Sequence, residues 1–101
     1  MTMRVFTHTL TNDEIQPVEV PTQCQFLEIS YMLNGTALLH ALGDFSTSSV
    51  TRFVCRTTLR EKLPTESIRY IGSCVHQERG REYFFEAYDE SEIDKWRLTQ
   101  S

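Results

Sequence analysis

The chain has 101 residues, a formal net charge of −4 and a hydrophobic content of 40%. This length fits one domain, and no apolar run approaches the roughly 18 residues that a membrane-spanning helix needs. The overall acidity argues against general DNA binding, because affinity for nucleic acid comes mainly from cations that neutralise phosphates.

Short apolar segments separated by turn residues predict a mainly β chain. Pro17 interrupts the second segment and places it at a sheet edge, since proline cannot donate a ladder hydrogen bond. The expected strands are Arg4–Leu10, Ile15–Val20, the two arms of a hairpin within 25–42, Val50–Arg56, Ile68–His76 and Glu82–Tyr88. We therefore expect a compact antiparallel sheet, sandwich or partly open barrel of about six or seven strands. One domain should span 1–101, with a β core at 4–88 and a short C-terminal helix at 89–98.

The central hairpin has the clearest turn signal, Asn34-Gly35, which favours a two-residue type I′ turn. That turn places Tyr31 opposite Leu38 and Ile29 opposite His40. The predicted core face consists of Leu27, Ile29, Tyr31, Leu33, Leu38 and Leu42, with His40 among them.

His40 thus falls at an unusual position among aliphatic side chains. It is either a neutral, hydrogen-bonded core histidine or a ring that lines a ligand cleft. A zinc site from the three histidines of the chain is not expected, because the short ligand spacings of such sites are missing.

The C-terminal segment Asp89-Glu90-Ser91-Glu92 resembles a capping box and predicts a helix start. Ile93 and Trp96, three residues apart, should share one helix face. We expect Trp96 to pack on the sheet, since so short a helix needs tertiary contacts.

Catalytic and cofactor motifs are missing from the sequence. It has no GxSxG elbow, no local Cys–His signature and no glycine-rich phosphate loop. Cys74 and His76 should share a strand face as packing residues, and Glu82 and Glu86 should lie on the solvated face of the last strand. The odd number of widely spaced cysteines predicts free thiols rather than disulfides or a metal knuckle. We expect no catalytic residue, no metal and no cofactor, hence no enzyme.

The basic residues provide the best candidate site. Residues 50–81 hold seven cations and three acids, while the segments on either side are acidic. Arginine presents a planar fork that suits phosphate, so this segment is a candidate anion site. The alternative is a solvated strand face whose charges protect a sheet edge. The candidate residues are Arg52, Arg56, Arg60 and Lys62, with His40 or Tyr70 stacking on a base.

The order of short motifs is similar to a family of small β domains encoded mainly by bacteriophages. The motifs are RVFTHTL, VEVP, FLEISYMLNGTALLHAL, RFVC, YIGSC and YFFEAY, and the likeness covers residues 4–88. His40 stands where the family usually has tryptophan, and the segment 56–59 stands where it tends to have Gly-Thr-Gly. The family has no known activity, so the resemblance implies only a phage-type genome and a compact β fold.

These observations lead to an expected function. We expect a non-enzymatic phage-type protein, in the host cytoplasm, that masks or sequesters a host-defence protein or a signalling nucleotide. The alternative is a structural or assembly component of a phage particle. The segment MTMRVFTHTL has no long apolar run and no small-residue cleavage site, so no signal peptide is expected. A homo-oligomer is expected because the core is thin and strand edges need cover, whereas membrane binding is not expected.

Overall fold

The computed structural model describes residues 2–58 and 69–100, which form seven strands and one helix. This confirms the mainly β prediction with a short C-terminal helix. The elements are β1 (Arg4–Thr9), β2 (Ile15–Pro21), β3 (Cys24–Tyr31), β4 (Ala37–Gly43), β5 (Ser49–Thr57), β6 (Arg69–His76), β7 (Gly80–Ala87) and α1 (Glu90–Gln100).

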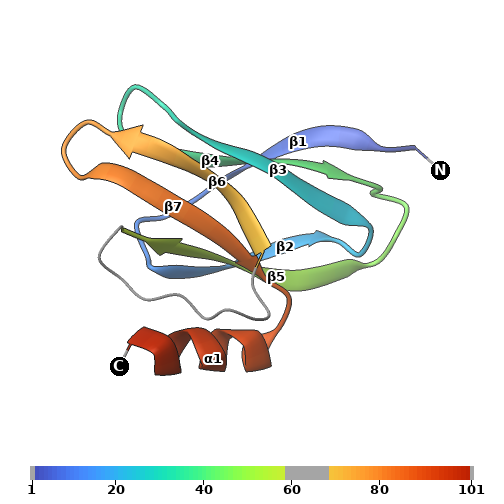
Figure 1. Cartoon of the computed structure of the whole chain (residues 1–101). Coiled ribbons are helices and arrows are strands. Elements are labelled where there is room, and N and C mark those ends of the chain that lie inside the picture. The colour runs from blue at the N-terminus through green and yellow to red at the C-terminus, as the bar shows by residue number, and fades with distance from the viewer. Residues whose placement is uncertain (1, 59–68, 101) are drawn as a thin grey trace.

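Two antiparallel sheets face each other as a sandwich (Figure 1). The three-stranded sheet has the order β1-β4-β3, and the four-stranded sheet has the order β2-β5-β7-β6. β2 lies at an edge, as Pro17 predicts. Within the described residues the sheets do not close into a barrel, and no helix there is long and apolar enough to cross a bilayer.

The main core fills the space between the sheets, and a second core lies under α1. Leu39, Val18 and Phe84 are among the fully buried side chains of the main core. Under α1, Trp96 and Ile93 pack with Cys55 and Ala87 against the four-stranded sheet.

The helix cap forms as the sequence predicts. The Glu92 backbone N–H donates to Asp89 Oδ1 at 3.1 Å, and the indole of Trp96 is only 1% exposed. The predicted helix, with Trp96 packed on the sheet, is therefore confirmed.

The β3–β4 loop is one residue longer than the predicted two-residue turn, so that prediction is wrong. Gly35 donates its N–H to the Met32 carbonyl at 2.9 Å, and Met32 donates to the Thr36 carbonyl at 2.8 Å. Gly35 has a φ of 86°, so the loop has three residues and ends in a left-handed glycine. Tyr31 consequently pairs with Ala37 rather than with Leu38.

This shift reverses the two faces of β4. Ala37, Leu39 and Ala41 point into the core, while His40 and its apolar neighbours Leu38 and Leu42 lie on the opposite face. The prediction that His40 faces the core is therefore wrong.

A bulge in β3 changes which side chains of that strand face the core. The register shifts between Phe26 and Glu28, so Phe26 and Ile29 both point inward although they are three residues apart. Leu27 and Leu33, both predicted to be core residues, are 40% and 100% exposed. Leu27 is exposed because the bulge turns Phe26 inward in its place, and Leu33 is exposed because it lies in the three-residue loop.

Candidate functional site

The inner face of β7 carries two buried carboxylates. Glu82 and Glu86 are 4% and 7% exposed and flank Phe84, which is 1% exposed. The prediction that these glutamates lie on a solvated face is wrong. Their neighbours Tyr83 and Phe85 occupy the other face of β7, and Phe85 packs towards α1, so the alternation turns both glutamates inward.

Glu86 belongs to a cluster that we call the helix-end cluster (Arg52, Arg69, Glu86, Tyr88 and Glu92). Arg52 Nη1 donates to Glu86 Oε2 at 2.8 Å and to the carbonyl of Cys24 at 2.9 Å, and its Nη2 donates to the carbonyl of Thr22 at 2.9 Å. Burial raises the pKa of Glu86 above its ordinary value, and the hydrogen bond and charge of Arg52 offset only part of this effect.

The same cluster ties α1 to the sheet. Arg69 donates to Glu92 Oε1 at 2.9 Å, and its guanidinium carbon lies 3.3 Å from the ring centroid of Tyr88. Glu92 also accepts the backbone N–H of Tyr88. These contacts give the helix-end cluster a structural role.

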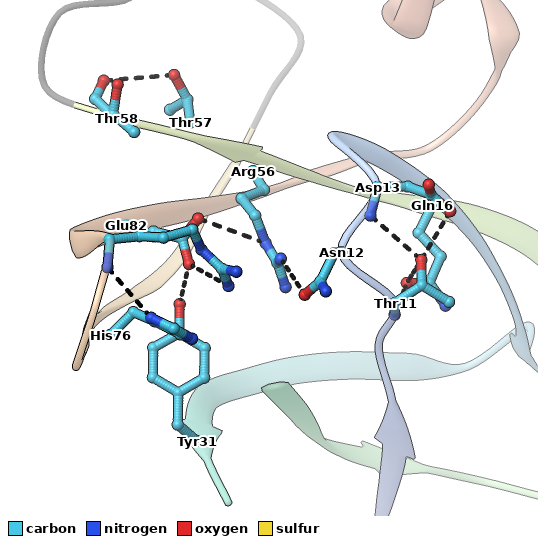
Figure 2. Close-up of polar contacts among 11 residues, drawn as sticks. Thr11, Asn12, Asp13, Gln16, Tyr31, Arg56, Thr57, Thr58, His76 and Glu82 are labelled. Carbon is cyan, nitrogen blue, oxygen red and sulfur yellow. Dashed lines mark hydrogen bonds and ion pairs between the residues drawn. The ribbon is translucent and has the colours of Figure 1, made fainter. Parts of the chain in front are cut away.

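Glu82 belongs to a second cluster at the other end of β7, the cleft-end cluster (Tyr31, Arg56, Arg79 and Glu82). The Tyr31 hydroxyl donates to Glu82 Oε1, and Arg79 Nη2 donates to the same oxygen at 3.2 Å. Arg56 Nε lies 4.0 Å from Glu82 Oε2, which makes an ion pair without a hydrogen bond. Figure 2 shows Tyr31 and Arg56 converging on Glu82 from different strands.

Arg56 is the least satisfied member of this cluster. Its side chain is 8% exposed, and its guanidinium carbon lies 5.0 Å from the ring centroid of Phe84. Its Nη1 reaches Asn12 Oδ1 only at 3.4 Å, and its buried Nε has no hydrogen-bond partner within the described chain. A buried donor without a partner is costly, so Arg56 retains capacity to bind an acceptor.

A cleft of about 840 Å³ opens beside this cluster, and three connections line it. They are 10–12 between β1 and β2, 31–36 between β3 and β4, and 75–79 between β6 and β7. Tyr31, Asn12 and Arg79 contribute to the wall.

His76 joins two of these connections. Its Nδ1 accepts the backbone N–H groups of Glu78 and Arg79 at 3.1 and 3.2 Å. Its ring meets Tyr31 edge to face at 5.3 Å, and a Cβ on Gly35 would lie 3.0 Å from its Nε2. Glycine at position 35 therefore lets the β3–β4 loop approach the histidine closely.

Burial and charged partners set the protonation states in the cleft-end cluster. Burial would raise the pKa of Glu82, but the Tyr31 hydrogen bond and the charges of Arg56 and Arg79 outweigh it, and the pKa lies below its ordinary value. Burial and the Glu82 hydrogen bond raise the pKa of Tyr31. Glu82 thus stays ionised and Tyr31 stays protonated near neutral pH. An efficient general acid or base, in contrast, has a pKa close to the pH at which it works.

The sequence-predicted site residues that the structure describes, Arg52, Arg56, His40 and Tyr70, do not come together in one site. Arg52 and Arg56 point between the sheets and are paired with Glu86 and Glu82, while Arg60 and Lys62 lie outside the described residues. His40 lies on the outer face of the three-stranded sheet, where its Nε2 is 2.7 Å from Ser30 Oγ. Tyr70 is 58% exposed on the far side of the four-stranded sheet, against Phe85. Among the residues placed, none lines the cleft, and Arg56 reaches it only through its bond to Asn12 of the wall.

Sequence reasoning missed Tyr31, His76, Arg79 and Glu82 as site residues. One signal was present: arginines four residues apart on β5 match glutamates four residues apart on β7. In antiparallel neighbours this spacing allows two ion pairs on one face. The loop residues gave no such signal, because three separate connections form the cleft.

Thiol chemistry and metal binding find little support among the described residues. Burial raises the pKa of Cys55 to about 12, and all three cysteines are free. No three His, Cys, Asp or Glu side chains come together there as in a metal site.

Comparisons of the chain with protein-family models, with curated proteins and with solved structures found no match.

Proposed function

We propose that the chain is a non-enzymatic, phage-type binding protein that sequesters an anionic host-defence ligand, such as a signalling nucleotide, in the three-loop cleft. It would act in the host cytoplasm. The observation that carries this proposal is Arg56, a buried arginine with an unpartnered Nε and one long hydrogen bond, which it makes to Asn12 of the cleft wall.

The cleft supplies further donors for an anion. Arg79 is 39% exposed at the mouth and donates to Glu82 through one nitrogen only. Because the Nδ1 of His76 accepts two backbone N–H groups, the N–H of the ring lies at Nε2, which can donate. Charge-assisted donors of this kind bind phosphate oxygens strongly.

The ring of Tyr31 and the exposed side chains of Met32 and Val75 line the same cleft and give a nucleobase an apolar contact. A volume of about 840 Å³ lies in the range typical of small-molecule sites. Sequestration needs only binding, which agrees with the protonation states of Tyr31 and Glu82. The resemblance to phage-encoded domains supports the biological setting.

The test is calorimetric titration with linear mononucleotides, cyclic dinucleotides and inorganic phosphate. Arg79→Gln should weaken binding at least tenfold, since it removes a charged donor from the mouth. Arg81→Gln is the matched control, because Arg81 is also exposed but contacts Ser73 instead of the cleft-end cluster.

Binding should also weaken with added salt, because Arg79 is partly exposed and its interaction is screened. If no probe binds, or if Arg79→Gln and Arg81→Gln weaken binding equally, the cleft is not the ligand site.

A role in assembly is the second candidate, and the outer face of the three-stranded sheet favours it. Val5 is 68% exposed there, and β1 forms an open sheet edge. Exposed edges pair readily with other chains. A partner of a phage particle would bind at this sheet and leave the cleft free, so Arg79→Gln would not affect assembly.

A further inference from the structure

The outer face of the three-stranded sheet is a regular grid of nine side chains. Strand register places three residues from each strand on this face, with β4 in the centre. They are Val5, Thr7 and Thr9 from β1, Leu38, His40 and Leu42 from β4, and Gln25, Glu28 and Ser30 from β3. None of the described elements covers this face, whereas α1 covers the outer face of the other sheet (Figure 1).

We propose that this grid is the interface of a twofold homodimer, with His40 at the axis and the two three-stranded sheets face to face. The proposal is independent of the ligand cleft. A strand that is apolar on both faces is typical of a strand covered on both sides. β4 has this pattern, with Leu39 and Ala41 on the core side and Leu38 and Leu42 on the outer side.

The charge of the grid favours a second copy of the chain over a nucleic acid or a strongly charged protein. Glu28 is its only formally charged residue, although the whole chain carries −4. Two copies can therefore meet here without bringing their acidic surfaces together. A nucleic acid would need cations, and a strongly charged protein would need opposite charge.

The pattern of the central strand is symmetric about His40. Leu38 and Leu42 lie two residues before and after it and point to the same side. A twofold axis that runs along β4 in the plane of the interface brings each leucine onto its own copy and histidine beside histidine. Because Thr7 and Glu28 flank His40 on opposite sides, this axis sets Glu28 of one copy opposite Thr7 of the other, so the two glutamates stay apart. Polar side chains on the two outer strands then form a rim, the usual anatomy of an interface.

The size of the face sets the expected affinity. Strands of six to eight residues make it roughly 23 Å long, and three strands make it roughly 14 Å wide. This footprint is smaller than the roughly 800 Å² that each partner of a stable complex buries. The dimer should therefore be weak, with a dissociation constant on the order of micromolar or weaker.

Sedimentation velocity across micromolar to near-millimolar concentrations tests the proposal. The parent protein should shift from the mass of one chain, 11.8 kDa, towards twice that mass. Val5→Asp should abolish the shift, because it puts a charge on the face at a side chain exposed enough not to affect folding. Leu33→Asp is the control, since Leu33 is fully exposed at the hairpin tip and lies off the grid.

A second measurement locates the axis. His40→Cys, treated with a short bis-maleimide, should give covalent dimers in higher yield than Leu33→Cys or the parent protein with its three native cysteines. A protein that stays monomeric throughout, or dimerises equally well with Val5→Asp, or cross-links no better at position 40 than at 33, overturns the proposal.

Discussion

The helix-end and cleft-end clusters contain the same chemistry on the same face of β7, but they use their arginines differently. Arg52 makes three hydrogen bonds shorter than 3 Å, one of them to Glu86. Arg56 makes one of 3.4 Å and meets Glu82 only at 4.0 Å. Arg52 thus uses its donors to hold the fold, whereas Arg56 keeps a donor without a partner next to Asn12 of the cleft wall.

The largest expected difference between the two clusters is in the stability that is lost when their arginines are removed. Arg52→Met should lower the free energy of unfolding by about 3–5 kcal/mol, because it leaves Glu86 buried without its main partner. Arg56→Met should cost only about 1–2 kcal/mol, since Glu82 keeps Tyr31 and Arg79. Urea unfolding measures both. Equal losses would mean that the two clusters do not differ in this way.

A smaller effect should appear at the two glycines with positive φ. Gly80→Ala should cost about 1 kcal/mol, because its φ of 78° strains an L residue while the space around it is open. Gly35→Ala should strain the backbone to a similar degree, and its Cβ would also lie only 3.0 Å from His76 Nε2. The loss of stability should therefore be larger for Gly35→Ala than for Gly80→Ala. Thermal unfolding of both variants compares them. If Gly35→Ala were no worse than Gly80→Ala, the close approach at the cleft end would not matter for stability.

The smallest expected effect is on the pH dependence of stability. This effect has opposite signs in the cleft-end and helix-end clusters. The lowered pKa of Glu82 contributes stability that is present above pH 4.5 and lost as the pH falls below it. The raised pKa of Glu86 contributes stability that is present below pH 4.5 and lost as the pH rises through the raised value.

Glu82→Gln should therefore gain stability relative to the parent as the pH falls, and Glu86→Gln should gain it as the pH rises. Urea unfolding at several pH values checks both trends. If both variants followed the same trend with pH, the pKa values of Glu82 and Glu86 would be shifted in the same direction.

Much of the fold follows from local signals in the sequence. Pro17 marks an edge strand, Asp89 caps the helix and Trp96 anchors it, as the structure confirms. Local chemistry decides each of these features, so a single sequence is enough to predict them.

The orientation of side chains could not be predicted in the same way. Asn34-Gly35 fits either a two-residue or a three-residue loop, and the choice decides which face of β4 is buried. The bulge at Leu27 has no clear sequence signal. The inward direction of Glu82 and Glu86 depends on Arg52 and Arg56 of a neighbouring strand, so tertiary pairing determines that part of the site.

The packing of Trp96 has a spectroscopic consequence. It is the only tryptophan in the chain, it is 1% exposed, and its ring centroid lies 6.1 Å from that of Phe85. Its fluorescence should therefore be blue-shifted in the native protein and should shift to the red when α1 leaves the sheet. The amide I infrared band of β-sheet reports on the strands, so the two signals followed together would reveal whether the helix detaches before the sandwich unfolds.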